Sequence, residues 1–161
     1  METEGVFSFD DADSARETYA ALGPAARTVV RETARAMGFD REEYGDRVTG
    51  EVVETARDAL FASLLSVRVG TREEYEAWLE EYDGPVHETG SERVDRAAWH
   101  VPGFADEAVA TTFQDEREAA VGTLRRQAFG RVYRGVLYDG TDGGGANGGG
   151  DDAEPATGGG R

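Results

Sequence analysis

The sequence predicts an α+β domain, in which N-terminal helices precede a small, mainly antiparallel sheet. Two observations favour this class. Apolar residues recur at helical spacings of three and four in the first half of the chain, and runs of alternating apolar and polar residues follow one another in the second half. Consecutive strands with helices around them are typical of an α+β arrangement. The length of 161 residues suits one domain, which we place at residues 1–138.

Two helices are expected near the N-terminus. The first, SARETYAAL, begins at a cap from Asp13 or Ser14 and ends at Gly23-Pro24. The second starts at that proline, which a first helical turn tolerates, and runs to about Met37. Its apolar positions, which the spacing assigns to one face, are Ala26, Val29, Val30, Thr33 and Met37.

Two short motifs mark the next helices. Asp40 with Glu43 resembles a capping box for the turn DREEYG, and helical spacing resumes from Thr49. The alternation in LLSVRVG predicts a strand from about Leu65. A second capping box, Thr71 with Glu74, opens the helix TREEYEAWLEEY.

Three strand segments and a helix complete the predicted order of strand, helix, three strands and helix. The turn TGSE separates the runs PVHE and RVDRAAWHVP, which predicts a hairpin. The run EAVATTFQ adds a third strand, and the last helix extends from about Asp115 to Tyr138. Residues 139–161 are Gly-rich and acidic and hold no large apolar side chain, so we expect a disordered tail.

The chain is strongly acidic. Asp and Glu number 33, the basic residues number 17, and all 17 are Arg, which gives a formal net charge of −16. Dense carboxylates without Lys are typical of a cytoplasmic protein from a salt-accumulating halophile, and an acidic mesophilic protein is the alternative.

Four stretches resemble a family of small haloarchaeal proteins of unknown function. They are VTGEVVETARDALFASLL, VGTREEYEAWLEEY, ERVDRAAWH and TTFQDEREAAVGTLRRQAFGRVYR. The resemblance covers about residues 1–135 and supports the halophilic origin. It implies no activity, ligand or functional residue.

Several function classes find no support in the sequence. Cys is absent, which excludes disulfides, thiolate zinc sites and a Cys nucleophile. The acidic start METEGVFSFDDADS lacks the pattern of a signal peptide, and no apolar run approaches the length of a membrane span. No cofactor fingerprint, metal cluster or nucleophile elbow is present, so we expect no cofactor and no metal, and an enzyme is disfavoured.

The two histidines are candidates for an anion or ligand site. In the predicted hairpin His87 faces Asp95, and His100 lies some 15–20 Å away at about 3.3 Å per residue, which disfavours a shared metal. We expect His87 to form a surface pair with Asp95 and His100 to be a partly exposed sheet residue.

Two arginines are further anion candidates. Arg72 lies at a helix start, where backbone amides attract anions. Arg125 falls inside the apolar stripe of the last helix, so it needs either a buried carboxylate or an anionic ligand.

Aromatic and basic residues provide candidates for a partner surface. They are Tyr75, Trp78, Tyr82 and Tyr133 among the aromatics, and Arg126, Arg131 and Arg134 on the last helix. On a helical wheel these arginines spread around the arc outside the apolar stripe, so a structural role is favoured over a nucleic-acid-binding face.

Taken together, these patterns favour a protein-interaction or regulatory binding module. A small enzyme or anion-binding protein with an Arg/His pocket is the first alternative. Nucleic-acid binding through the C-terminal Arg-rich helix is the second, and the acidic remainder of the chain opposes it.

Lowering the salt concentration is expected to destabilise the fold. The Debye length is roughly 3 Å at 1 M salt and about 10 Å at 0.1 M, so carboxylates on a chain of net charge −16 repel one another far more at low salt. The melting temperature, followed by circular dichroism, should fall over that range. A melting temperature that is constant or rises on dilution would contradict the self-repulsion.

Overall fold

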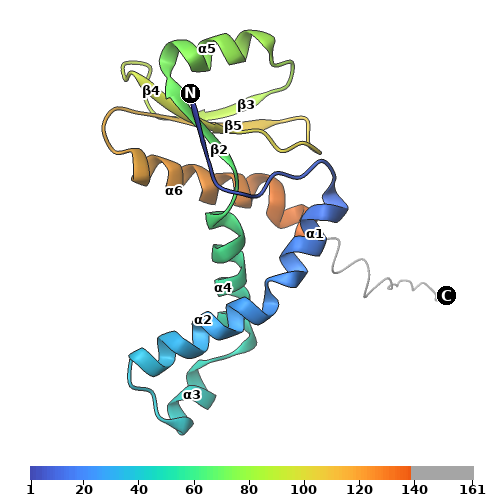
Figure 1. Cartoon of the computed structure of the whole chain (residues 1–161), viewed down its shortest axis with the longest axis vertical. Helices are drawn as coiled ribbons and strands as arrows, with labels where there is room; N and C mark the ends of the chain where they lie inside the picture. Colours follow the sequence, from blue (N-terminus) through green and yellow to red (C-terminus); the bar gives the residue numbers. More distant parts are fainter. Residues whose placement is uncertain (139–161) are drawn as a thin grey trace, which may run out of the picture.

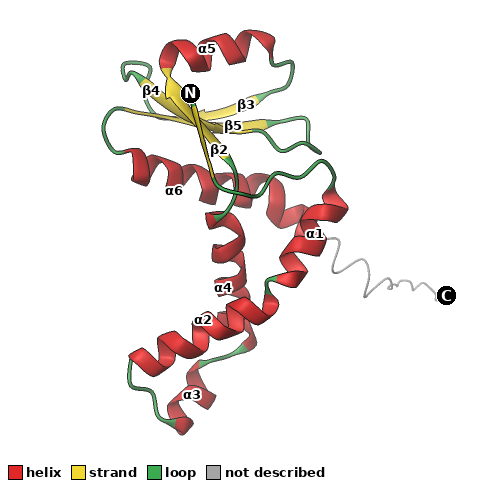
Figure 2. Cartoon of the chain, viewed as in Figure 1, coloured by secondary structure: helices red, strands yellow, loops and turns green. Residues whose placement is uncertain are grey.

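A computed structural model describes residues 1–138 and places a five-stranded mixed sheet at one end of the molecule and a group of helices at the other (Figure 1). The elements in chain order are β1 (Glu2–Glu4), α1 (Ala12–Ala21), α2 (Gly23–Ala36), α3 (Arg41–Arg47), α4 (Gly50–Ser63), β2 (Val67–Thr71), α5 (Arg72–Glu81), β3 (Val86–Thr89), β4 (Arg96–His100), β5 (Ala108–Phe113), α6 (Arg117–Ala128) and the π-helical turn η1 (Phe129–Tyr133). The predicted α+β class is confirmed (Figure 2). The predicted tail, residues 139–161, lies outside the described residues.

The sheet has the strand order β1-β2-β4-β5-β3. The pairs β1–β2, β2–β4 and β4–β5 are antiparallel, whereas β3 pairs with β5 in parallel. Helix α5 covers one face and α6 covers the other, so the sheet lies between two helical layers (Figure 1). The predicted order from β2 to α6 is confirmed, and the short strand β1 was not predicted.

The predicted hairpin across TGSE is wrong, because β5 lies between β3 and β4. The connecting segment crosses the end of β5, where the Ser91 N–H donates a hydrogen bond of 2.8 Å to Thr112 Oγ1. Gly90 has a φ of +111°, a left-handed conformation that favours glycine in this turn. Strands β3 and β4 run in opposite directions, as the hairpin required, but each forms its hydrogen bonds with β5.

Side-chain caps define most helix starts. The predicted capping boxes are present at α3 and α5, and Thr49 caps α4. Helix α1 begins earlier than predicted, because Asp11, rather than Asp13 or Ser14, is the cap and accepts the Ser14 N–H at 2.7 Å. The last helix is not continuous α-helix as predicted, since a π-helical turn follows Ala128.

Phe61, at the C-terminal end of α4, is the centre of an aromatic cluster and is fully buried. The rings whose centroids lie 5.4–6.0 Å from that of Phe61 are Phe7, Phe9, Tyr19, Phe129 and Tyr133. These residues come from the N-terminal segment, α1 and η1. The cluster therefore joins α4 to the N-terminal and C-terminal parts of the chain.

The polar partner of this cluster is Asp58, one turn earlier on α4. Its carboxylate accepts hydrogen bonds from the Tyr19 hydroxyl at 2.5 Å and from the Tyr138 hydroxyl at 2.7 Å. Burial and the neighbouring carboxylate raise the pKa of Tyr19. Helix α1 and the C-terminal end of the described chain are thus anchored to α4.

Substituting Phe61→Ala should lower the free energy of unfolding by about 3–5 kcal/mol, because a large buried ring is lost and leaves a cavity. Met37→Ala is the matched control, since that side chain is 64 % exposed, and its effect should stay below about 0.5 kcal/mol. Chemical denaturation at constant high salt measures both. Equal effects of the two substitutions would contradict the central position of Phe61.

Candidate interaction groove

Residues 23–63 form a helical arm that extends from the sheet (Figures 1 and 2). Within it α2 crosses α4, and α3 packs at the far end. The arm is entirely helices and turns, and its base is the aromatic cluster around Phe61. This arrangement exposes both sides of the α2–α4 crossing.

One side of the crossing carries an apolar groove with a volume of about 320 Å³. The groove is lined from α2 and its end by Val29, Val30, Thr33, Ala34, Met37 and Phe39, and from the α3–α4 side by Arg47, Val48, Val52, Thr55, Ala56 and Ala59. Apart from one arginine and two threonines, these side chains are aliphatic, thioether or aromatic. The groove is therefore suited to an apolar surface rather than to a charged metabolite.

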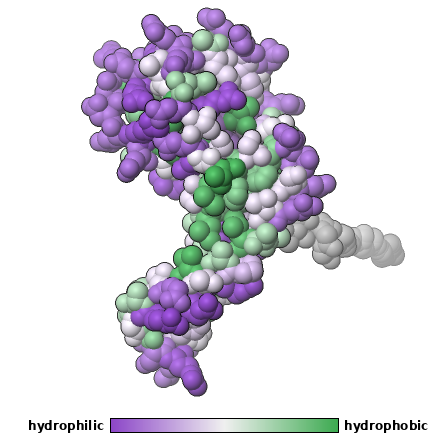
Figure 3. Space-filling view, in the orientation of Figure 1, coloured by the Kyte–Doolittle hydropathy of each residue, from purple (hydrophilic) through white to green (hydrophobic). Residues whose placement is uncertain are grey.

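Large hydrophobic side chains are exposed at this groove. Val29 is 44 % exposed, Met37 64 % and Val52 41 %, whereas the other exposed large hydrophobics among residues 1–138 are Met1 and Val6 in the N-terminal segment. Figure 3 shows apolar residues gathered over α4 and its crossing with α2, between the hydrophilic surfaces of the sheet and of the tip. Contiguous exposed apolar surface of this kind is typical of an interaction site.

Local sequence signals shape the arm. Pro24 lies in the first turn of α2, and Gly38 ends the helix with a φ of +79°. Beyond the turn, the Arg47 guanidinium lies 5.4 Å from the centre of the Phe39 ring, which ties α3 to the end of α2. The contact between Arg47 and Phe39 thus closes the far end of the groove.

The predicted apolar face of α2 is present but is only half buried. Ala26 and Val30 pack inside the arm, whereas Val29, Thr33 and Met37 are exposed along the groove. Helical spacing identified the face correctly, and the structure shows that other described residues cover only part of it.

Charge is unevenly distributed over the arm. Helix α2 carries three arginines and one glutamate, and the arginines Arg27, Arg31 and Arg35 recur every four residues on its exposed surface. Residues 40–63, which include α3 and α4, carry seven Asp and Glu against three Arg. These charges lie mostly away from the apolar groove, since Arg27, Glu51, Glu54 and Arg57 line a separate hollow on the other side of the α2–α4 crossing, and the one charged residue in the groove lining is Arg47.

His100 is buried, at 3 % exposure, which corrects the expectation of a partly exposed residue. Its Nδ1 lies 2.6 Å from the Ser66 carbonyl oxygen, to which it donates, so Nε2 accepts from the Tyr133 hydroxyl at 2.7 Å. Burial lowers the pKa of His100, and the charges of Arg125 and Arg68 act in the same direction. The residue is a neutral, fully bonded link between β4, β2 and η1.

His87 does not meet Asp95, because the hairpin that paired them does not form. Its Nε2 lies 2.7 Å from Glu107 Oε1. Both His87 and His100 are register partners of Val109, so two strand spacings, about 10 Å, separate their backbones rather than the predicted 15–20 Å. The two histidines nevertheless have different hydrogen-bond partners, Glu107 for His87 and Ser66 with Tyr133 for His100.

A polar cleft of about 520 Å³ opens beside His87, at the edge strand β3. Its other lining residues are Glu88, Thr89, Gln127, Gly130 and Arg131. Of the predicted anion candidates only His87 lines it, and the arginine there is Arg131. The structure does not bring Arg72, Arg125 and the two histidines together.

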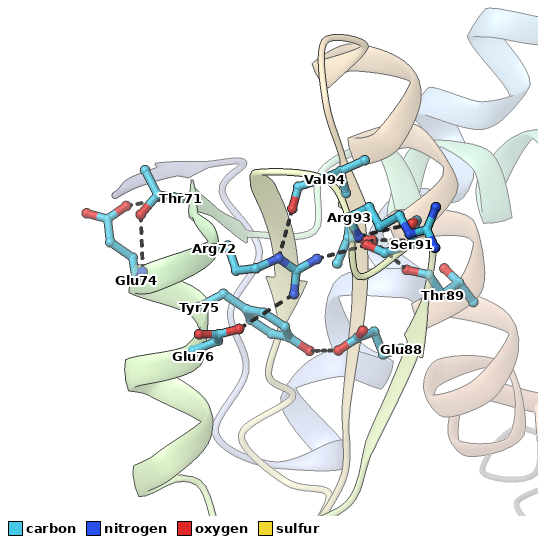
Figure 4. Close-up of polar contacts among 11 residues, drawn as sticks. Thr71, Arg72, Glu74, Tyr75, Glu76, Glu88, Thr89, Ser91, Arg93 and Val94 are labelled. Atoms are coloured by element: carbon cyan, nitrogen blue, oxygen red, sulfur yellow. Dashed lines mark hydrogen bonds and ion pairs between the residues drawn. The ribbon is translucent and has the colours of Figure 1, made fainter.

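Arg72 holds the β3–β4 connection (Figure 4). Its Nε donates to the Val94 carbonyl and its Nη2 to the Ser91 carbonyl, each at 2.8 Å, while Nη1 lies 3.8 Å from Glu76. The guanidinium is therefore engaged by backbone carbonyls at the position where the sequence suggested an anion.

Arg125 meets a backbone carbonyl rather than a buried carboxylate. Its Nε donates to the Leu65 carbonyl oxygen at 2.9 Å, beside the turn where the N-terminal segment passes. Burial lowers the pKa of Arg125, and the charge of Glu4 opposes that shift. This side chain fastens α6 to the chain entering β2.

The aromatic candidates lie mainly inside the protein. Tyr75 and Tyr133 are fully buried, and the Tyr75 hydroxyl donates to Glu88 at 2.7 Å (Figure 4). Trp78 and Tyr82 are half-buried and stack on each other at 4.8 Å. The aromatic candidates therefore offer at most a partial surface beside α5.

The three candidate arginines of the last helix have separate surroundings. Arg126 donates to Thr123, Arg131 lines the polar cleft, and Arg134 lies 4.0 Å from Asp58. This separation agrees with the helical wheel, on which they share no single stripe.

No helix in residues 1–138 combines the length and the apolar character needed to cross a membrane. Across the same residues, no group of three or more His, Asp or Glu side chains is arranged to hold a metal ion.

Residues 6–134 match a family model described as a family of unknown function (DUF5809). The chain belongs to this family. No curated protein and no solved structure matches the chain. The predicted membership of a family of unknown function is confirmed, and the DUF5809 match spans both the sheet and the helical arm.

Within this DUF5809 chain, acidification should weaken the fold through His100. The folded pKa lies below the ordinary value of about 6.5, so as pH falls below 6.5 the unfolded chain gains a proton that the folded chain does not. The free energy of unfolding should therefore decrease from about pH 6.5 down to the folded pKa, and denaturation series at several pH values measure that slope.

The matched variants are His100→Gln and His87→Gln. In His100→Gln the free energy of unfolding should depend less steeply on pH, because the contribution of His100 is lost. In His87→Gln that pH dependence should be retained. An unchanged slope in His100→Gln would contradict the assignment.

Proposed function

We propose that the chain is a protein-interaction module that binds a partner through the groove of its helical arm. The observation that carries the proposal is the gathering of Val29, Met37 and Val52, all exposed, along one apolar groove. Burying these side chains against a partner releases about 25 cal/mol for each Å² of apolar surface removed from water. Small lining residues such as Ala56 and Ala59 leave room for a helix to approach closely.

The lining of the groove favours the apolar face of an amphipathic helix. Its one charged residue is Arg47, at the far end beside Phe39. Such a helix lays its apolar side chains in the groove and keeps its polar face in water.

The setting that we propose is the cytoplasm of a halophilic archaeon. The net charge of −16 and the exclusive use of Arg among basic residues support this setting, as does the resemblance of the chain to small haloarchaeal proteins. High salt screens surface charge, so apolar burial provides most of the binding free energy there.

Anion binding at the polar cleft is a second candidate function. The presence of His87 and Arg131 along one cleft favours it, and Glu88 in the lining and Glu107 on His87 oppose a strongly negative ligand. Nucleic-acid binding through the last helix has less support, because Arg126, Arg131 and Arg134 are dispersed.

Two synthetic helical peptides with the same charged residues, one with a leucine face and the other with serine at those positions, test the groove. The leucine-faced peptide should bind at least about tenfold more tightly, a difference of about 1.4 kcal/mol, when followed by fluorescence anisotropy at a fixed salt concentration.

Val29→Asp should weaken this binding by at least about tenfold, because it places a carboxylate on the apolar groove. Val6→Asp is the matched control, since Val6 is 71 % exposed and lies outside the groove. Binding of neither peptide, or equal binding by both variants, would overturn the proposed site.

A further inference from the structure

We propose that the hollow on the other side of the α2–α4 crossing binds a free α-amino acid, with two arginines on its carboxylate and two glutamates facing its ammonium group. The hollow has a volume of about 510 Å³. It is lined by Gly23, Arg27, Gly50, Glu51, Val53, Glu54 and Arg57. None of these residues lines the apolar groove, so this site is separate from the proposed partner site.

Two guanidinium groups converge over Gly23, the first residue of α2. A Cβ atom added to Gly23 would lie 3.8 Å from Nη1 of Arg27 and 3.8 Å from Nη1 of Arg57. The two nitrogens are therefore at most twice that distance apart. A carboxylate, each of whose oxygens accepts an N–H at about 2.9 Å, spans such a separation and contacts both arginines.

These arginines are not neutralised from within the described chain. Neither guanidinium has a hydrogen-bond or ion-pair partner among residues 1–138, although Glu51 and Glu54 line the same hollow. The Nε of Arg57 is moreover buried without a hydrogen-bond partner. A guanidinium held in this way gains from an anionic group at its remaining donors.

The Arg57 guanidinium is held in place by the ring of Tyr19. Its central carbon lies 4.3 Å from the centre of that ring, and the Tyr19 hydroxyl donates to Asp58 at 2.5 Å. A donor that is already fixed loses little conformational entropy when a ligand binds. Gly23 contributes by having no side chain, because a Cβ would occupy the space between the two Nη1 atoms.

The glutamates determine the charge of the ligand. With two Arg and two Glu the lining has no net charge, so a simple anion is attracted by one pair and repelled by the other. An α-amino acid carries a carboxylate and an ammonium group on one carbon and complements both pairs. Val53 adds an apolar contact in the same hollow, which suits an aliphatic side chain.

Three small molecules that differ by one charged group test the ligand class. L-Valine carries both groups, isovalerate is the same skeleton without the ammonium group, and isobutylamine is that skeleton without the carboxylate. In nuclear magnetic resonance titrations of the full chain at fixed pH and salt, valine should bind at least about tenfold more tightly than either analogue.

Two variants test the position of the site. Arg27→Gln should weaken valine binding at least about tenfold, whereas Arg31→Gln, the matched control, should leave it unchanged, since Arg31 lies outside the lining and pairs with Glu32. Gly23→Ala should also weaken binding. Its melting temperature should not fall, because the added Cβ makes ordinary contacts at 3.8 Å and Ala favours a helix over Gly.

Three results would overturn the proposal. They are the absence of valine binding, equal binding of valine and isovalerate, and equal effects of Arg27→Gln and Arg31→Gln. Equal binding of valine and isovalerate would make the hollow a simple anion site. None of these results bears on the groove, because the leucine-faced peptide and Val29→Asp test residues that do not line the hollow.

Discussion

The packing of Phe61 is the interaction on which the rest of the structure depends. Its ring stacks on Phe9 and meets Tyr133 edge-on, so the end of α4 is fixed to both the N-terminal segment and η1. Asp58 adds hydrogen bonds from Tyr19 and Tyr138 one turn earlier. Because these contacts fix the C-terminal end of α4, the helical arm extends from the sheet in a defined direction. The groove between α2 and α4 is therefore held in a fixed position relative to the sheet.

Local chemistry made much of the fold predictable. A capping box involves residues three apart, and an apolar helical face repeats every three or four residues, so both are visible in the sequence before any packing is known. The position of β3 was not predictable in this way. Its four residues, VHET, give no strong alternation, and the insertion of β5 beside it depends on pairing with a segment about twenty residues away. The partner of His87 was missed for the same reason, since Glu107 directly precedes β5.

The groove illustrates a different limit of sequence reasoning. The apolar face of α2 was correctly identified, but periodicity does not distinguish a face that packs on its own chain from one that meets a partner. On α4 the complementary face consists largely of Thr and Ala, whose small side chains give a weak apolar signal. The groove exists because this small-residue face of α4 crosses the apolar face of α2, and the spacing of residues within one helix does not predict that crossing.

Exposed apolar surface and high net charge have opposing effects on association, and the arm combines them. Acidic surface over the sheet and its helices resists unspecific contact, because any approaching copy or acidic neighbour carries the same charge. An apolar groove inside a nearly charge-balanced arm is therefore accessible mainly to a partner that matches its shape and its apolar lining. At 1 M salt the Debye length is roughly 3 Å, so repulsion outside the groove acts only at contact distance, and the fit of a partner to the apolar lining provides most of the selectivity.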